Sequence, residues 1–306
     1  METRKLRFLG HELTPREWRL VREVVASCDG LSRAELANTV CELLGWRRRS
    51  GSLKGRECRD LLEKLEAAAL GRLPEKRAGR PLGRRTAVPR TPQGEPGVEV
   101  GGTAGELGAI ELERVQTEEQ QRLFRELVER YRYLGHAVPL GAQLRYLVYG
   151  SVPERRLVAC LQFSSAAWKL GVRDRWIGWD RARRVRHLVH GVNNSRYLVL
   201  PWIHMRNLAS RVRSVAVRRM ATDWEERYRV EPWWVETMVD PTRYRGSCYR
   251  AANWIELGRT SGQARVYGQR QRVAVTPKTV LVYPLVRNAA ARLREGKDAG
   301  FSRTSG

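Results

Sequence analysis

The sequence predicts a two-part protein in which a small helical, winged-helix-like head precedes a larger α/β (α+β) body with a mixed sheet. Three observations support this prediction. Helix-start signals repeat within residues 1–73, a basic Pro- and Gly-rich stretch covers residues 74–107, and apolar strand patterns alternate with helical ones over residues 108–291. A length of 306 residues with 42% hydrophobic side chains is comfortable for two domains.

The charge balance narrows the range of partners. Lys and Arg number 57 against 33 Asp and Glu, which gives a net charge of +24. A chain this basic is typical of proteins that bind polyanions, because clustered cations attract phosphates. A solubilising surface or a ribosome-associated protein would also explain the charge. We favour nucleic acid as the partner.

Cysteine usage and hydropathy indicate a cytoplasmic protein. The five cysteines are odd in number and form no C-x-x-C pair, which argues against a zinc ribbon and a disulfide framework. No apolar leader opens the chain, and no apolar run approaches the roughly 20 residues of a membrane span. No membrane contact is therefore expected. His187 and His190 lack a third ligand nearby, so no structural metal is expected either.

The head, residues 1–73, is predicted to contain three helices. Capping boxes at Thr14–Glu17 and Ser32–Glu35 open the first two, and the third covers about residues 54–69. Residues 70–74 are expected to form a short strand leading into a wing. A basic third helix is typical of helix-turn-helix and winged-helix DNA-binding domains, and a helical docking or dimerisation domain is the alternative. The candidate DNA contacts of the head are Arg47, Arg48, Arg49, Lys54, Arg56 and Arg59.

Residues 74–107 are predicted to form a basic, flexible linker. They contain Gly79-Arg80-Pro81, which resembles a minor-groove hook, and the candidate contacts here are Arg77 and Arg80. A plain cationic tether is the alternative and would also bind phosphates. The tail, residues 292–306, is expected to be disordered because it has little apolar content.

The body is predicted to combine antiparallel strands with later alternating strands and helices. A capping box at Thr117–Gln120 opens one helix, and a second helix is expected over residues 208–220. Strands are expected at residues 144–149, 157–163, 197–200, 233–239 and 280–283. This order of elements predicts the mixed sheet.

Three residues of the body are candidates for catalysis. Glu236 and Asp240 lie near the end of one predicted strand, where paired carboxylates are able to bind Mg²⁺ or act as acid and base. The alternative is that they neutralise Arg243 and Arg245. Tyr249 is a candidate nucleophile or proton donor, with a packing role as the alternative.

A further set of side chains in the body is suited to contacting nucleic acid. Amides and arginines at strand ends read base edges or bind phosphates, although such asparagines also satisfy backbone groups in turns. Ten tryptophans add faces on which unpaired bases stack, although core packing will use several of them. The candidates are Asn193, Asn194, Arg196, Arg206, Asn207 and Asn253.

Several segments in fixed order resemble the DruA family of the Druantia anti-phage system. They lie mainly between Tyr131 and Pro284 and include Tyr-Arg-Tyr-Leu-Gly, Phe-Ser-Ser-Ala-Ala-Trp-Lys-Leu, Asp-Arg-Trp-Ile-Gly-Trp, Val-Asn-Asn-Ser-Arg-Tyr and Gly-Ser-Cys-Tyr-Arg-Ala-Ala-Asn-Trp. The resemblance implies a bacterial protein of phage defence or of mobile genetic elements. It implies no particular reaction.

A second resemblance concerns the fold of the body. Residues 197–220 and 233–258 resemble two strand-and-helix units of GNAT-type acyltransferases, which implies a GNAT-like sheet. Such enzymes bind the pyrophosphate of their cofactor with a glycine-rich loop at a helix N-terminus. Residues 202–207 contain no glycine, so coenzyme A is not expected as a cofactor.

Taken together, these features predict a DNA-binding protein of anti-phage defence or of transposon-like mobile elements. We expect the head to grip duplex DNA and the body to engage a nucleotide or a single strand. One alternative is a nucleic-acid-modifying or cleaving enzyme, either a GNAT-like transferase or a nuclease with Mg²⁺ as cofactor. The other is a non-catalytic adaptor that recruits defence or transposition proteins.

Overall fold

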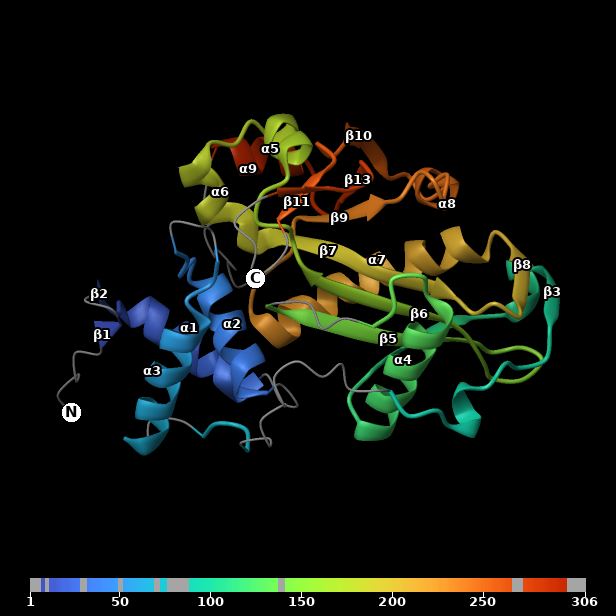
Figure 1. Ribbon diagram of the computed structural model, residues 1–306, viewed down its shortest axis with the longest axis horizontal. Helices are drawn as coiled ribbons and strands as arrows, with labels where there is room; N and C mark the ends of the chain where they lie inside the picture. The colour runs from blue at the N-terminus through green and yellow to red at the C-terminus, as the bar shows by residue number, and fades with distance from the viewer. Residues whose placement is uncertain are drawn as a thin grey trace, which may run out of the picture.

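The computed structural model describes residues 7–8, 11–27, 32–48, 52–68, 72–75, 88–136, 141–265 and 272–295 (Figure 1). Three candidate contacts, Arg49, Arg77 and Arg80, lie outside these residues, as do residues 296–306 of the expected tail. The tail segment that is described, up to Glu295, belongs to helix α9 (Ala289–Glu295).

The head contains the three predicted helices. They are α1 (Pro15–Ser27), α2 (Arg33–Leu43) and α3 (Gly55–Ala67). At the start of α2, Ser32 accepts from the Glu35 amide while the Glu35 carboxylate accepts from the Ser32 amide, so both halves of the capping box form. Apolar side chains from all three helices, including Val21, Leu36 and Leu62, are buried.

The described residues do not show winged-helix character. The α2–α3 connection covers residues 44–54 and is closed by a bridge between Arg47 and Leu53, whereas a helix-turn-helix uses a turn of about three to four residues. Residues 72–75 form no strand, and the two-residue strands β1 (Arg7–Phe8) and β2 (His11–Glu12) pair before α1 rather than after α3.

The body is built on a seven-stranded mixed sheet, as predicted. Its spatial order is β10-β13-β9-β7-β6-β5-β4, and β7 and β9 form its parallel pair. That pair requires a crossover, which helix α7 (Leu208–Tyr228) provides. The strands are β4 (Ile110–Arg114), β5 (Gln143–Gly150), β6 (Arg156–Ser165), β7 (Gly191–Val199), β9 (Trp234–Val239), β10 (Ile255–Arg259) and β13 (Thr279–Pro284).

Helices cover the two faces of this sheet. Helix α7 covers the face to which Tyr146 of β5 points, because the Tyr146 hydroxyl donates to Asp223 of α7 at 2.8 Å. The opposite face carries α4 (Glu118–Tyr131), where the guanidinium of Arg145 lies 5.8 Å from the Phe124 ring centroid. Tyr146 and Arg145 are neighbours in one strand, so their side chains point to opposite faces. Figure 1 shows the same arrangement, with α7 behind the strands and α4 in front.

Smaller elements complete the body. Within the segment expected to be a linker, residues 92–107 form regular structure: a 3-10 turn at Pro92–Gly94, strand β3 (Val100–Thr103) and a second turn at Ala104–Leu107. Strand β3 pairs in parallel with β8 (Ile203–Arg206), so ordered structure begins before Gly108. The others are α5 (Gly171–Ile177), α6 (Arg181–His187), a 3-10 turn at Leu188–His190, α8 (Ser247–Arg250), β11 (Gln263–Arg265) and β12 (Arg272–Ala274).

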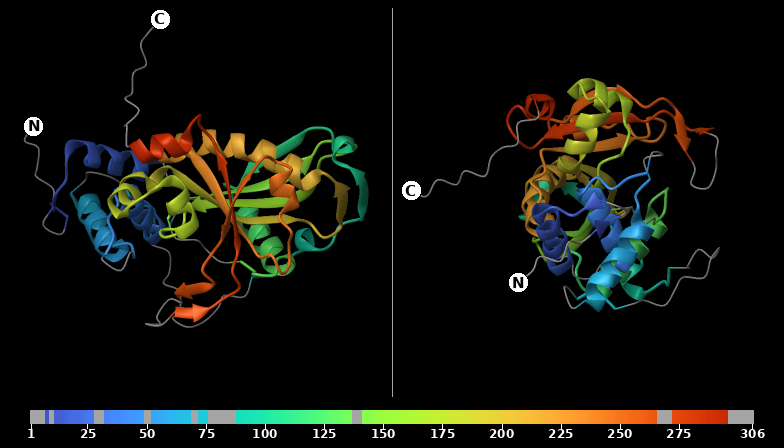
Figure 2. Two further views of the ribbon diagram at one scale, coloured as in Figure 1. Left: turned by 90° about the horizontal axis from the view of Figure 1, so that it is seen from above. Right: turned by 90° about the vertical axis from the view of Figure 1, so that its left-hand side faces the viewer.

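The head packs against the body at the ends of β5 and β6. Arg47, after α2, lies with its guanidinium 4.2 Å from the ring centroid of Trp168. Glu42 of α2 accepts hydrogen bonds from Ser165 and from the Ala142 amide. Figure 2 shows the three head helices at one end of the sheet. None of the described helices has the length and apolar character needed to cross a membrane.

Candidate functional site

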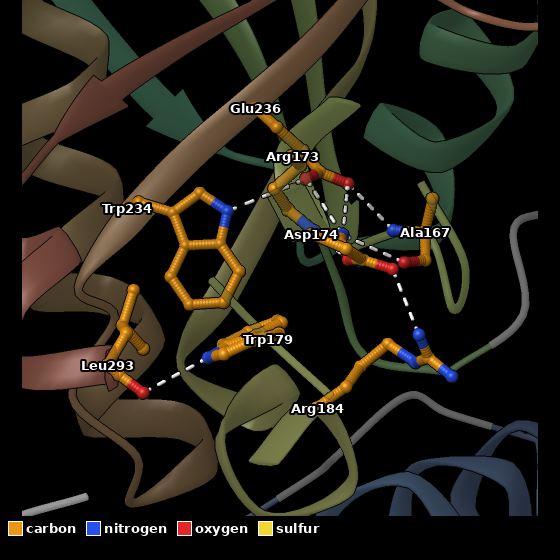
Figure 3. Close-up of polar contacts among 8 residues, drawn as sticks. All are labelled: Ala167, Arg173, Asp174, Trp179, Arg184, Trp234, Glu236 and Leu293. Carbon is orange, nitrogen blue, oxygen red and sulfur yellow. Dashed lines mark hydrogen bonds and ion pairs between the residues drawn. The ribbon is translucent and has the colours of Figure 1, made fainter. Parts of the chain in front are cut away.

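Glu236, a candidate catalytic residue of the sequence analysis, is part of a buried ion-pair network (Figure 3). It is 0% exposed, and Arg173, also 0% exposed, places its Nη1 2.9 Å from Oε2 of Glu236. The Ala167 amide donates to the same carboxylate at 2.8 Å. Arg173 also pairs with Asp174 at 2.7 Å, and Asp174 pairs with Arg184 at 2.9 Å. Glu236 therefore neutralises Arg173, and not Arg243 or Arg245 as the alternative interpretation expected.

Asp240 does not share a site with Glu236. The two residues are four positions apart along an extended chain, which separates them by roughly 13 Å. Asp240 accepts from the Thr242 hydroxyl at 2.6 Å and from the Thr242 amide at 3.0 Å, and these bonds, with Arg243 nearby, lower the pKa of its carboxyl.

Among the described residues, no group of three or more His, Cys, Asp or Glu side chains is arranged to hold a metal ion.

Tyr249 lies in a buried polar cluster on the α7 face. Its hydroxyl donates to Asn194 Oδ1 at 2.9 Å and accepts from Thr237 Oγ1 at 3.3 Å. The guanidinium of Arg213 lies 3.6 Å from its ring centroid. The structure thus brings together two predicted site residues, Tyr249 and Asn194, but they are only 6% and 5% exposed and bond to each other.

The remaining predicted contacts are spread over the molecule. Arg206 is exposed at the end of β8, and Asn253 is exposed in the turn after α8. Asn207, which has a left-handed backbone (φ 63°), lines a shallow pocket of about 560 Å³ with Ser210 and Arg211. In the head, Arg47 pairs with Glu42 at 3.4 Å and Arg48 pairs with Glu57. No ion pair within the described part of the chain involves the three other head candidates, Lys54, Arg56 and Arg59.

A row of polar side chains crosses three central strands on the α4 face. Arg145 of β5 pairs with Gln162 of β6, which pairs with Arg196 of β7, and directly paired residues point to the same face of a sheet. A bulge follows Gln162, because Phe163 pairs with Asn194 and Ser164 with Asn193. The bulge places Asn193 on the same face as Arg196, and Asn194 on the opposite face.

Arg132 and His136 extend this row from the C-terminal end of α4. Burial, followed by the charge of Arg196, lowers the pKa of Arg132 to about 10, and burial also lowers the pKa of Arg145 and of Arg196. Burial, with the charge of Arg145 as the next cause, lowers the pKa of His136 to about 4. We refer to Arg132, Arg145 and Arg196 as the arginine cluster.

The arginine cluster has unsatisfied charge. None of its three side chains forms an ion pair with any carboxylate in the described ranges. Glu35 of α2 reaches its edge, where Gln143 Nε2 donates to it at 3.1 Å. On this face, six buried polar atoms have no hydrogen-bond partner among the described residues: Arg132 Nη1, Arg145 Nε, Arg196 Nε, His136 Nε2, Gln162 Oε1 and Asn193 Oδ1. Half-buried positive charges that lie together favour an anionic ligand, because it would offset both their desolvation and their mutual repulsion.

Sequence reasoning found Arg196 and Asn193 of this site but missed the other members. One signal was present, since Arg132 lies between two tyrosines in the segment Tyr131–Leu134. Gln143, Arg145 and Gln162 also interrupt otherwise apolar strands. Their common face depends on strand register, which the sequence pattern alone did not provide.

Comparison with known families identifies the protein class. The profile of the family described as "Druantia protein DruA" matches residues 93–270, more than half of the chain. The chain belongs to this family. The DruA family is a protein family of Druantia anti-phage defence. In this DruA-family chain, the arginine cluster, Glu236 and Tyr249 all lie within the matched range, and the three head helices lie before it.

Solved structures similar to this DruA-family chain include several acetyltransferases and an N-acyl amino acid synthase. Spermidine N-acetyltransferase from Vibrio cholerae, in complex with CoA and spermine, has 8% identity and a TM-score of 0.38 over 57% of this chain and 95% of its own. A Bacillus subtilis acetyltransferase in complex with CoA has 9% identity and a TM-score of 0.33 over 58% and 98%. FeeM, an N-acyl amino acid synthase from uncultured soil microbes, has 8% identity and a TM-score of 0.31 over 58% and 92%.

The search of curated proteins found no match. The GNAT-type likeness expected from the sequence is thus found among solved structures. Nothing about substrate, cofactor or reaction follows from similarities of this size.

Proposed function

We propose that this DruA-family protein binds nucleic acid in anti-phage defence and that the arginine cluster contacts its phosphates. The observation that supports this proposal is the cluster itself, in which three half-buried arginines lie together without a carboxylate partner in the described residues. Uncompensated burial of charge is unfavourable, and charge-assisted hydrogen bonds to phosphate offset it.

Two further features agree with a nucleic-acid ligand. The net charge of +24 would attract a polyanion over a distance and make binding strongly dependent on salt. In the head, Lys54, Arg56 and Arg59 sit at the start of α3 and would supply further phosphate contacts to a duplex, as the sequence analysis predicted. Arg47 and Arg48 already pair with glutamates, so we assign them no phosphate.

A salt series of binding measurements tests the proposal. Fluorescence anisotropy of labelled duplex and single-stranded DNA would be measured with the full chain and with the double variant Arg145→Gln/Arg196→Gln. Each phosphate contact contributes about 0.7–0.9 to the slope of log K against log salt concentration. We expect the double variant to bind more weakly and to lose about 1–2 from the magnitude of this slope.

A matched control removes the same charge elsewhere. Arg122→Gln/Arg156→Gln also lowers the net charge by two, at side chains that are 67% and 30% exposed and pair with glutamates outside the cluster. The control is expected to bind nearly as the unaltered chain does. Equal losses of affinity in the two double variants would mean that the effect comes from net charge and not from the arginine cluster. If the unaltered chain shows no salt-dependent binding, the proposed function is refuted.

A further inference from the structure

Two tyrosine rings are exposed beside the arginine cluster. Tyr133 follows α4 and is 37% exposed, and Tyr244 follows β9 and is 55% exposed. They are the only exposed Tyr, Trp or Phe side chains among the residues whose burial is described. Although more than a hundred positions apart in the chain, their ring centroids lie 5.9 Å apart with an angle of 49° between the planes.

Arginines flank these rings. The guanidinium of Arg243 lies 4.6 Å from the Tyr133 ring centroid, and that of Arg132 lies 5.6 Å from it. Aromatic faces that alternate with arginines form platforms on which unpaired bases stack, because every base has a π-face. The core does not account for these two rings, since both remain in contact with solvent.

Arg132 connects the tyrosine pair to the arginine cluster. It contacts the Tyr133 ring and lies close enough to Arg196 for the two charges to repel. The same face also holds buried acceptors without a donor, Gln162 Oε1 and Asn193 Oδ1. A ligand that fits this face would present an anionic group to the arginines and an aromatic ring to the tyrosines.

We propose that the tyrosine pair and the arginine cluster together form a site for an unpaired nucleotide of a nucleic-acid strand. The phosphate lies against Arg132 and Arg196, and the base stacks on Tyr133 and Tyr244. This inference rests on the proposed function for its phosphate contacts and adds to it a preference for unpaired strands.

The test compares ring-removing and ring-retaining variants of the full chain. Tyr133→Leu/Tyr244→Leu removes both rings, and Tyr133→Phe/Tyr244→Phe retains them without the hydroxyls. Anisotropy would report affinity for a single-stranded DNA 12-mer, the matching RNA and a blunt duplex. A 2-aminopurine in the single strands would report stacking through the quenching of its fluorescence. Thermal unfolding of each variant would show that the fold is retained.

We expect the affinity of the leucine variant for single strands to fall about tenfold or more, and the quenching to be lost. Base–aromatic stacking is worth about 1–3 kcal/mol per base, and 1.4 kcal/mol is tenfold in affinity. The phenylalanine variant should bind as the unaltered chain does, and duplex affinity should change little in both. Tight binding to either the DNA or the RNA strand supports the site, and the tighter of the two identifies the strand.

The result that overturns the inference differs from the one that overturns the proposed function. If the leucine variant binds and quenches single strands normally while Arg145→Gln/Arg196→Gln loses binding, the phosphate contacts stand and the base site is wrong. If the unaltered chain binds no nucleic acid at any salt concentration, the proposed function fails and the base site fails with it.

Discussion

Replacing Glu236 with leucine tests whether this carboxylate serves the fold or a reaction. The substitution removes the partner of Arg173 from an environment with 0% exposure of both side chains. Leaving a buried charge without its partner typically costs about 3–5 kcal/mol. Asp174 still pairs with Arg173 at 2.7 Å, so we expect the lower part of this range, about 3 kcal/mol.

Urea and thermal unfolding would measure this loss. For a body of this size, a loss of about 3 kcal/mol lowers the Tm by roughly 6–12 °C. The milder Glu236→Gln keeps the shape and one acceptor, and is expected to cost about 2 kcal/mol. Combining Glu236→Leu with Arg173→Met removes both charges, so the double variant should be more stable than the sum of the two single losses predicts.

A Tm for Glu236→Leu within about 1 °C of that of the unaltered chain would refute this reasoning. It would mean that Arg173 is compensated without Glu236. A catalytic role for Glu236 predicts the reverse pattern, in which Glu236→Gln abolishes a reaction and leaves stability unchanged.

Three further predictions concern packing and pH. Gly191→Ala should lower the free energy of unfolding in urea by about 1–3 kcal/mol, because a Cβ there would lie 2.1 Å from Cζ2 of Trp234. Gly101→Ala is the control and should leave the free energy of unfolding unchanged, because nothing lies within 4 Å of a Cβ at that position. The pKa of His136 is lowered to about 4 in the folded protein. Its contribution to the free energy of unfolding, about 2–3 kcal/mol, is therefore present above pH 6.5 and is lost as the pH falls toward 4. His136→Gln should remove this part of the pH dependence of unfolding. Single-stranded DNA should raise the pKa of His136, as measured by NMR titration, and an unchanged value would argue against an anion beside it. Burial raises the pKa of Glu42 to about 6. Its contribution to the free energy of unfolding, about 2 kcal/mol, is therefore present below pH 4.5 and is lost as the pH rises through 6. Glu42→Gln should abolish this change of unfolding free energy with pH.

The sequence determined those features that depend on short-range contacts. The capping boxes at Ser32 and Thr117 start helices at the predicted residues, because the hydrogen bonds that satisfy a helix N-terminus join residues three positions apart. The alternation of apolar patterns also predicted the mixed sheet.

The tertiary structure decided which side chains meet. Glu236 was predicted to act with Asp240 or to neutralise Arg243 and Arg245, yet its partner is Arg173, from a helix that precedes it by 63 positions. An extended strand carries Asp240 away from it, so proximity in sequence did not give proximity in space.

The same reason governs the arginine cluster. A bulge beside Gln162 reverses the alternation of β7, and only this irregularity places Asn193 with Arg196 while burying Asn194 against Tyr249. Bulges and strand register are fixed by packing across the whole sheet and have no local sequence code of fixed spacing. The sequence thus determined where helices begin and which kind of sheet forms, and long-range packing determined which of the described charges are paired and which are not.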